Sequence, residues 1–292
     1  MNENVVTITG EHLSADISLL GAELRALRDA EGRDLLWNGD PAYWTGRAPV
    51  LFPIVGTLRN DRYSVGARSY TLPRHGFARR RMFGFVSGDE THAVFRLMHD
   101  PDTLAVYPFE FRLDISFAIH GHRLSVEAVV TNTGEEALPA SFGFHPAFRW
   151  PLPYGAPREE HRLLFDMEER GPLRRLDASG LFVATPLPSP VEGRTLRLRD
   201  DLFAADALVF TELEGRGVDY GAPEGPQLRL HYPDTPHLGV WSRPGAPFVC
   251  IEPWQGYSDP AGFAGGIWDK PGIVRISPGE HRGWRMDVLL IA

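Results

Sequence analysis

Apolar and polar residues alternate with a period of two along much of the chain, which is typical of strands with one buried face. The clearest run covers residues 111–130. Apolar side chains occupy the odd positions 111–119 and the even positions 124–130, and the residues between them are mostly polar. The short segment His120–Gly121–His122 separates the two halves. The pattern therefore predicts an antiparallel hairpin with its turn at Gly121.

Shorter runs of the same kind predict further strands, at residues 5–8, 15–19, 93–98, 228–232, 273–276 and 284–290. Residues 21–27 fit either a helix or a strand, and residues 41–44 predict one short helical turn. Residues 153–195, rich in Pro, Arg and Glu, predict loops and short strands at an edge. Many short strands with little helix predict an all-β fold, a large antiparallel β-sandwich. We expect one domain over residues 1–292.

Composition narrows the classes of partner and location. The formal net charge of -8 disfavours a nucleic-acid partner, because such surfaces are usually basic. The N-terminus lacks a signal-peptide pattern, and no apolar run approaches the ~20 residues of a spanning helix. We therefore expect a cytoplasmic protein without a membrane partner. Neither the composition nor the residue pattern indicates a particular oligomeric state.

Nothing in the spacing of cysteines and histidines predicts a metal or a cofactor. Cys250 is the one cysteine, so no intrachain disulfide forms, and we interpret it as a small core residue. The histidines show no spacing of the H-E-x-x-H kind, and no Gly-rich phosphate loop follows a strand. The expected protein binds neither a metal nor a cofactor.

Two stretches carry candidate acid–base groups. His145 lies among three phenylalanines in residues 141–148, between a glycine and a proline, where its charge can change near neutral pH. Glu252 ends an apolar run and is followed by Pro253 and Trp254. A carboxylate beside an aromatic surface suits a sugar, whose C–H face lies on the ring, although each residue alone is also compatible with a structural role.

Two further stretches carry candidate polar contacts. Arg59 follows an apolar run that ends at Gly56, and it is either a donor to substrate hydroxyls or a solvated turn residue. His75 lies in a loop bracketed by Pro73 and Gly76, and it either binds a sugar oxygen or caps a backbone group. Arg79 begins a run of three arginines that is either solvated or able to meet a phosphate.

These four stretches, in this order, resemble those of aldose 1-epimerases, the galactose mutarotase-like family, and its LacX-like bacterial branch in particular. The resemblance spans nearly the whole chain. It implies a large antiparallel β-sandwich with an open sugar cleft. It also implies a histidine acid at His145, a glutamate base at Glu252, and sugar contacts from Arg59 and His75. Trp254 is expected to offer its ring to the substrate.

The resemblance has one gap. The galactose-specific members carry an aspartate in a Gly-x-Asp-His-type segment that this sequence lacks, and Asp206 is the nearest analogue. The identity of the aldose is therefore left open.

The expected reaction is the interconversion of α and β anomers by ring opening and reclosure. One acid and one base suffice, and we expect His145 to face Glu252 across a gap about one sugar ring wide. Two alternatives stay open on the same fold: a non-catalytic sugar-binding or sensing protein, and a hexose-6-phosphate 1-epimerase. A hydrolase or lyase ranks below them, because such enzymes commonly use two carboxylates, and only Glu252 is a strong candidate.

Overall fold

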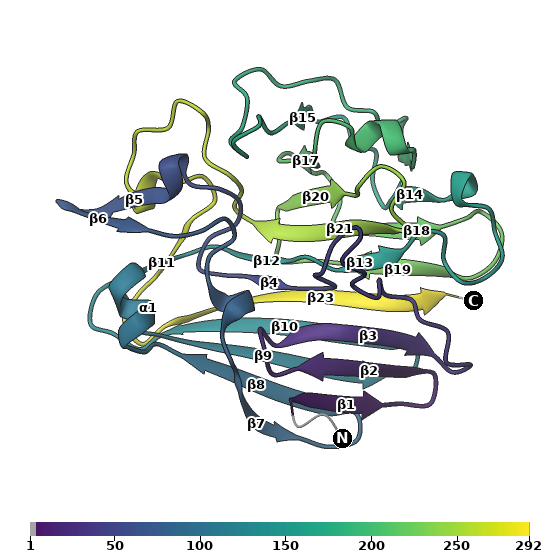
Figure 1. Cartoon of the computed structure of the whole chain (residues 1–292), viewed down its shortest axis with the longest axis horizontal. Helices are drawn as coiled ribbons and strands as arrows, with labels where there is room; N and C mark the ends of the chain where they lie inside the picture. The colour runs from purple at the N-terminus through teal and green to yellow at the C-terminus, as the bar shows by residue number, and fades with distance from the viewer. Residues whose placement is uncertain (1–3, 292) are drawn as a thin grey trace.

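Two large antiparallel sheets dominate the computed structural model, which describes residues 4–291 (Figure 1). The larger sheet has nine strands. In spatial order they are β16 (Thr195–Arg197), β14 (Arg162–Phe165), β18 (Gly217–Gly221), β19 (Gln227–His231), β23 (His281–Ile291), β10 (Arg123–Asn132), β9 (Phe111–His120), β8 (His92–Met98) and β7 (Gly84–Gly88).

The second large sheet has seven strands and carries most of the sequence motifs singled out above. Its path is β15 (Leu173–Arg174), β17 (Leu208–Phe210), β20 (His237–Trp241), β21 (Phe248–Gln255), β12 (Phe142–Phe144) and β4 (Val50–Leu51), with β13 (Ala147–Arg149) also paired to β21.

Smaller elements complete the described chain. A three-stranded sheet holds β1 (Val5–Thr9), β2 (Leu13–Ser18) and β3 (Glu23–Asp29). Two pairs are β5 (Arg62–Val65) with β6 (Arg68–Thr71), and β11 (Leu138–Ala140) with β22 (Val274–Ile276). The α-helix α1 (Pro101–Val106) is joined by five 3-10 turns: η1 (Arg59–Asp61), η2 (Ala78–Arg80), η3 (Arg158–Glu160), η4 (Asp200–Phe203) and η5 (Ile267–Asp269). No helix within residues 4–291 is long and apolar enough to cross a membrane.

The predicted all-β fold and the predicted hairpin are confirmed. Strands β9 and β10 pair from His120 and Arg123 down to Phe111 and Asn132, and Gly121 occupies the turn with φ 58°. The alternating apolar residues of both strands are buried. Residues 21–27 belong largely to a strand, β3. At residues 41–44 the amides of Tyr43 and Trp44 both donate to the Asp40 carbonyl, which forms one isolated turn with the hydrogen bond of an α-helix.

One hydrophobic cluster joins the sheets. It contains buried residues of the three-stranded sheet, such as Ile17, of the nine-stranded sheet, such as Phe117, and of the seven-stranded sheet, such as Ile251. This continuity supports the prediction of a single domain, which stays a prediction.

The loop of residues 73–77 is fastened to the segment that follows β4. The amide of His75 donates to the Gly56 carbonyl, and the amide of Phe77 donates to the Phe52 carbonyl. Gly76 lies between them with φ 69°, and a Cβ at this position would collide with the Phe52 carbonyl oxygen. A glycine is therefore required for the close approach that holds His75 in place.

We expect Gly76→Ala to lower the free energy of unfolding by about 2–4 kcal/mol, because it adds a backbone collision to an unfavourable φ. The matched control is Gly66→Ala, since Gly66 has φ 56° with open space around it. That control should lose only about 1–2 kcal/mol. Urea unfolding of both variants measures the difference, and equal losses would show that the close approach to Phe52 contributes nothing.

Candidate active site

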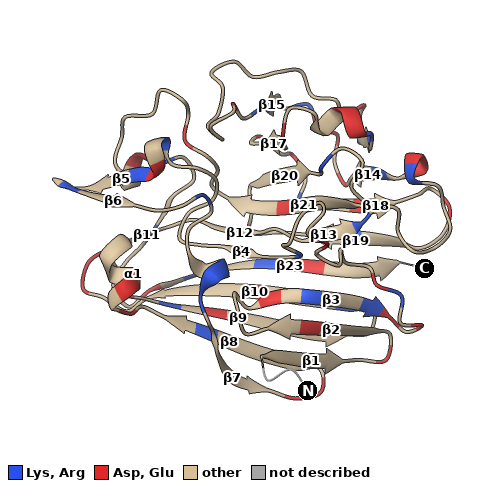
Figure 2. Cartoon of the chain, viewed as in Figure 1, with Lys and Arg blue, Asp and Glu red and all other residues tan. Residues whose placement is uncertain are grey.

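Strand β21 forms the floor of the site. Its side chains alternate between the two faces of the sheet, so Cys250, Glu252 and Trp254 share one face. Val249 and Ile251 point the other way, into the main core. In Figure 2 the strand shows one acidic band and no basic one, and its sequence contains Glu252 as the single charged residue.

His145 reaches this floor through an interruption in the neighbouring strand. Strands β12 and β13 both pair with β21, on either side of His145 and Pro146. The carbonyl of Pro146 accepts a hydrogen bond from the Ile251 amide, which holds the interruption against β21. The imidazole is thereby placed next to Glu252.

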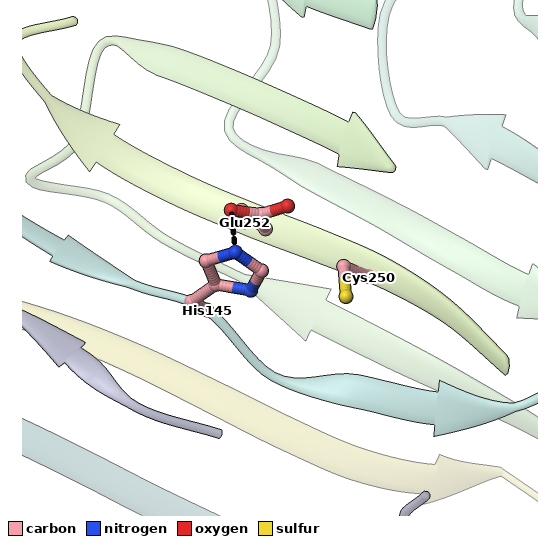
Figure 3. Close-up of side chains that lie close together, drawn as sticks. All are labelled: His145, Cys250 and Glu252. Carbon is pink, nitrogen blue, oxygen red and sulfur yellow. Dashed lines mark ion pairs between the residues drawn. The ribbon is translucent and has the colours of Figure 1, made fainter. Parts of the chain in front are cut away.

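The two side chains are in contact. Nε2 of His145 lies 3.0 Å from Oε2 of Glu252, as Figure 3 shows. The atoms are close but poorly aligned, and Oε2 of Glu252 and Nδ1 of His145 are buried without a hydrogen-bond partner. The expected gap of one sugar ring between them is therefore wrong. The observed contact has a local cause, because residues that face each other across adjacent strands are neighbours.

Burial favours the uncharged form of both groups. Glu252 is 1% exposed, and removal from water raises the pKa of its carboxyl well above the usual range. Burial, followed by the charge of Arg79, lowers the pKa of His145 from 6.5 to about 3. Both shifts favour a carboxylic acid beside a neutral imidazole over a buried ion pair.

The pair opens into a cleft of about 450 Å³ with aromatic and cationic walls. Trp44 stacks on the His145 ring at 4.9 Å between centroids, and Trp241 meets that ring edge-on at 6.2 Å. The cleft is also lined by Arg74, His75, Arg79, Asp206, Arg243 and Trp254.

Trp254 lies across two glycines of the flanking strands. A Cβ on Gly143 of β12 would come within 2.7 Å of its Cδ1, and one on Gly239 of β20 within 2.5 Å of its Cη2. The indole consequently lies against the sheet and also lines the cleft. Its Nε1 is buried without a partner, as is Nε of Arg79. Buried polar atoms are normally paired, so these two atoms are exceptions beside the cleft.

His75 presents an N–H group to the cleft. The Gly56 amide donates to its Nδ1 at 3.1 Å, so the neutral ring carries its proton on Nε2. Nε of Arg74 lies 3.3 Å from the same Nε2 and would also have to donate to it. We assign the proton to Nε2, because a backbone amide is fixed whereas a guanidinium can turn away. Burial, with Arg74 second, lowers the pKa of His75 well below 6.5.

Asp206 lies at the cleft rim in the left-handed conformation, with φ 64°. Its Oδ2 is 3.9 Å from Nη1 of Arg74. Arg175 fixes this loop from behind by donating to the carbonyls of Asp206 and Leu202, each at 2.8 Å. The carboxylate and the Arg74 guanidinium therefore stand together at the entrance.

The structure brings five of the six predicted residues together, namely His75, His145, Asp206, Glu252 and Trp254. Arg59 is the correction. It is exposed, does not line the cleft, and donates from Nη1 to the Phe263 carbonyl. The side chain of Arg59 is thus held by the loop of residues 256–266. Arg74 is a nearby arginine that does line the cleft. Sequence reasoning missed Trp44, Trp241 and Arg243, which sit outside any local motif.

We expect Gly239→Ala to push the Trp254 ring out of place and to lower the free energy of unfolding by about 1–3 kcal/mol. The matched control is the strand residue Gly84→Ala, where the nearest atom to an added Cβ is 3.9 Å away. Urea unfolding and near-ultraviolet circular dichroism measure both variants. An unchanged tryptophan signal in Gly239→Ala would contradict the packing described for Trp254.

The chain is similar to several known proteins. Residues 4–166 match the family model described as aldose 1-epimerase. The plasmid-encoded protein LacX of Lactococcus lactis subsp. lactis is 31% identical over 296 residues, which cover 98% of this chain and 99% of the relative.

Solved structures agree with that similarity. A galactose mutarotase related enzyme from Lactobacillus acidophilus superimposes with a TM-score of 0.90 at 28% identity, covering 99% of this chain and 97% of the other. A galactose mutarotase-like protein from Lactobacillus casei ATCC 334 gives a TM-score of 0.90 at 29% identity, with 98% and 100% coverage.

Proposed function

The chain belongs to the aldose 1-epimerase family, and on that premise we propose that it interconverts the α and β anomers of an aldose. The observation that carries the proposal is the buried contact between His145 and Glu252 at the base of an aromatic-lined cleft. Opening a hemiacetal requires one acid and one base near C1, and this pair can supply both.

The reaction moves two protons and breaks one bond. In the first arrangement, Glu252 as carboxylate takes the C1 hydroxyl proton while protonated His145 gives a proton to the ring oxygen. The bond between C1 and the ring oxygen breaks, rotation about C1–C2 exposes the other face of the carbonyl, and reclosure reverses the proton transfers. No covalent intermediate with the protein is needed.

Direct contact between the two groups suits this chemistry. The hydroxyl oxygen and the ring oxygen are both bonded to C1, so the groups that serve them can stand side by side. The neutral pair favoured by burial can also act, with Glu252 protonating the ring oxygen while His145 takes the hydroxyl proton. The two arrangements differ only in which of the two residues carries the transferable proton at the start.

Other lining residues would position the sugar. The Nε2–H of His75 can donate to a hydroxyl, and the Asp206 carboxylate can accept from one. Trp254 and Trp44 offer apolar faces for the C–H surface of the ring. Arg74 takes the donor position that the sequence had suggested for Arg59. Such positioning accelerates ring opening by holding C1 against the acid–base pair.

We expect Glu252→Gln and His145→Asn each to lower kcat by about 10²- to 10⁴-fold with sugar binding retained, because each removes one proton-transfer group. The measurement is NMR anomer exchange over a panel of free aldoses and their 6-phosphates. Glu169→Gln is the matched control, since Glu169 is also buried but lies outside the cleft. Wild-type protein that binds sugars without any acceleration would instead support the non-catalytic alternative.

The pH profile should reflect a pair that needs one proton. Below the lowered pKa of His145, about 3, a second proton binds and no base remains. Above the raised pKa of Glu252 the single proton is lost and no acid remains. We therefore expect kcat/KM, corrected for spontaneous mutarotation, to stay level as pH falls through 6.5. An acid limb near 6.5, the ordinary histidine value, would contradict this account of burial.

A hexose-6-phosphate is the second candidate substrate, and the arginines favour it. Arg74, Arg79 and Arg243 line the cleft, and within residues 4–291 neither Arg79 nor Arg243 forms an ion pair. Burial, followed by Arg80 and Arg74, lowers the pKa of Arg79 to about 10, yet it stays charged at neutral pH. Guanidinium groups recognise phosphate well. Higher kcat/KM for the 6-phosphates in the exchange panel would select this candidate.

A further inference from the structure

Cys250 stands beside the acid–base pair and takes no part in the proposed reaction. It is two residues before Glu252 on β21, so the two side chains share a face of the strand. Figure 3 shows the thiol and the carboxyl on the same side as the His145 ring. One possible ligand atom from each of the three residues lies within 4.8 Å of those from the other two. It is the one cluster of this kind within residues 4–291.

From this juxtaposition we propose that His145, Cys250 and Glu252 form a binding site for a thiophilic divalent cation of the Zn²⁺ type, and that the bound cation inhibits the enzyme. The donor set contains nitrogen, sulfur and oxygen. That mixture suits Zn²⁺ or Co²⁺ and disfavours Mg²⁺ and Ca²⁺, which prefer oxygen ligands alone.

The unsatisfied atoms of the cluster point to a ligand. His145 Nδ1 and Glu252 Oε2 are buried without a hydrogen-bond partner, and Cys250 is a free thiol. Ligand atoms around one Zn²⁺ lie about 3–4 Å apart, so closing the cluster onto an ion requires side-chain movement of roughly 1 Å. The cation enters from the cleft, which His145 and Glu252 line.

Charge balance permits a cation despite the nearby arginines. Binding displaces one proton from the thiol and one from the carboxyl, and both are released to solvent. A divalent cation, a thiolate, a carboxylate and a neutral imidazole then sum to zero, which a buried site favours. Three protein ligands leave one position open toward the cleft for water, the arrangement of open zinc sites. Neither His145 nor Glu252 can then transfer a proton to a sugar.

The test is a titration of tag-free protein with CoCl₂, read by the near-ultraviolet thiolate-to-Co²⁺ charge-transfer absorption. Because Cys250 is the only cysteine in the sequence, any such band reports on this site. We expect the band in the wild type, its displacement by ZnCl₂, and its absence from Cys250→Ala and Cys250→Ser. Glu252→Gln and His145→Phe keep the thiol but should bind Co²⁺ at least about 10- to 100-fold more weakly.

A matched control comes from strands β19 and β23 of the nine-stranded sheet. Nδ1 of His231 lies 3.7 Å from Oδ2 of Asp287, a histidine–carboxylate contact without a cysteine. His231→Asn should leave the band and its affinity unchanged. No band in the wild type, or a band equally strong in Glu252→Gln and His145→Phe, would overturn the proposal. Circular dichroism verifies that each variant is folded.

The inhibitory consequence is measured separately and rests on the proposed epimerase activity. ZnCl₂ should slow anomer exchange by the wild type, and EDTA should restore it. The folded Cys250→Ala variant should keep its basal rate and resist ZnCl₂ at least 10-fold better. Equal zinc sensitivity of this variant would overturn the inhibitory role. An enzyme without epimerase activity leaves the cobalt titration intact, so failure of the two proposals is distinguishable.

Discussion

The pairing of β12 and β13 with one strand, β21, is the constraint on which the cleft depends. Both segments are hydrogen-bonded to β21, and the two residues between them, His145 and Pro146, are held from both sides. The imidazole is consequently fixed beside Glu252 by the backbone. Trp44 and Trp241 then pack on the ring, and its burial lowers the pKa of the imidazole.

Burial of an acid beside a base is unfavourable to folding unless both are neutral, because an isolated charge away from water is strongly destabilising. The site meets this condition by sharing one proton between Glu252 and His145. It also leaves several polar atoms without partners, among them Nε of Arg79 and Nε1 of Trp254. The large hydrophobic core around the site offsets the cost of leaving these groups unpaired.

Much of the fold follows from local pattern. The period of two at residues 111–130 predicted β9 and β10 because one face of each strand is buried and the other is not. The order of four motifs identified the family. The site was harder to predict than the fold. The residues next to Arg59 in the sequence suggested that it lies in the cleft, but its guanidinium donates to the Phe263 carbonyl instead. Trp44 and Arg243 reach the cleft through tertiary packing, which no nearby sequence pattern records.

The cleft is lined by two kinds of segment, the strands of the sheet under Trp254 and the loops around them. Gly143 and Gly239 belong to strands, so the indole above them rests on a hydrogen-bonded floor together with Glu252. Arg74, Asp206 and Arg243 belong instead to segments outside the strands of that floor. The proposed acid–base pair therefore lies on the sheet, whereas the charged residues at the cleft entrance lie on loops. In the proposed reaction, insertions or substitutions in the outer segments can change which sugar is accepted while His145 and Glu252 keep their positions on the sheet.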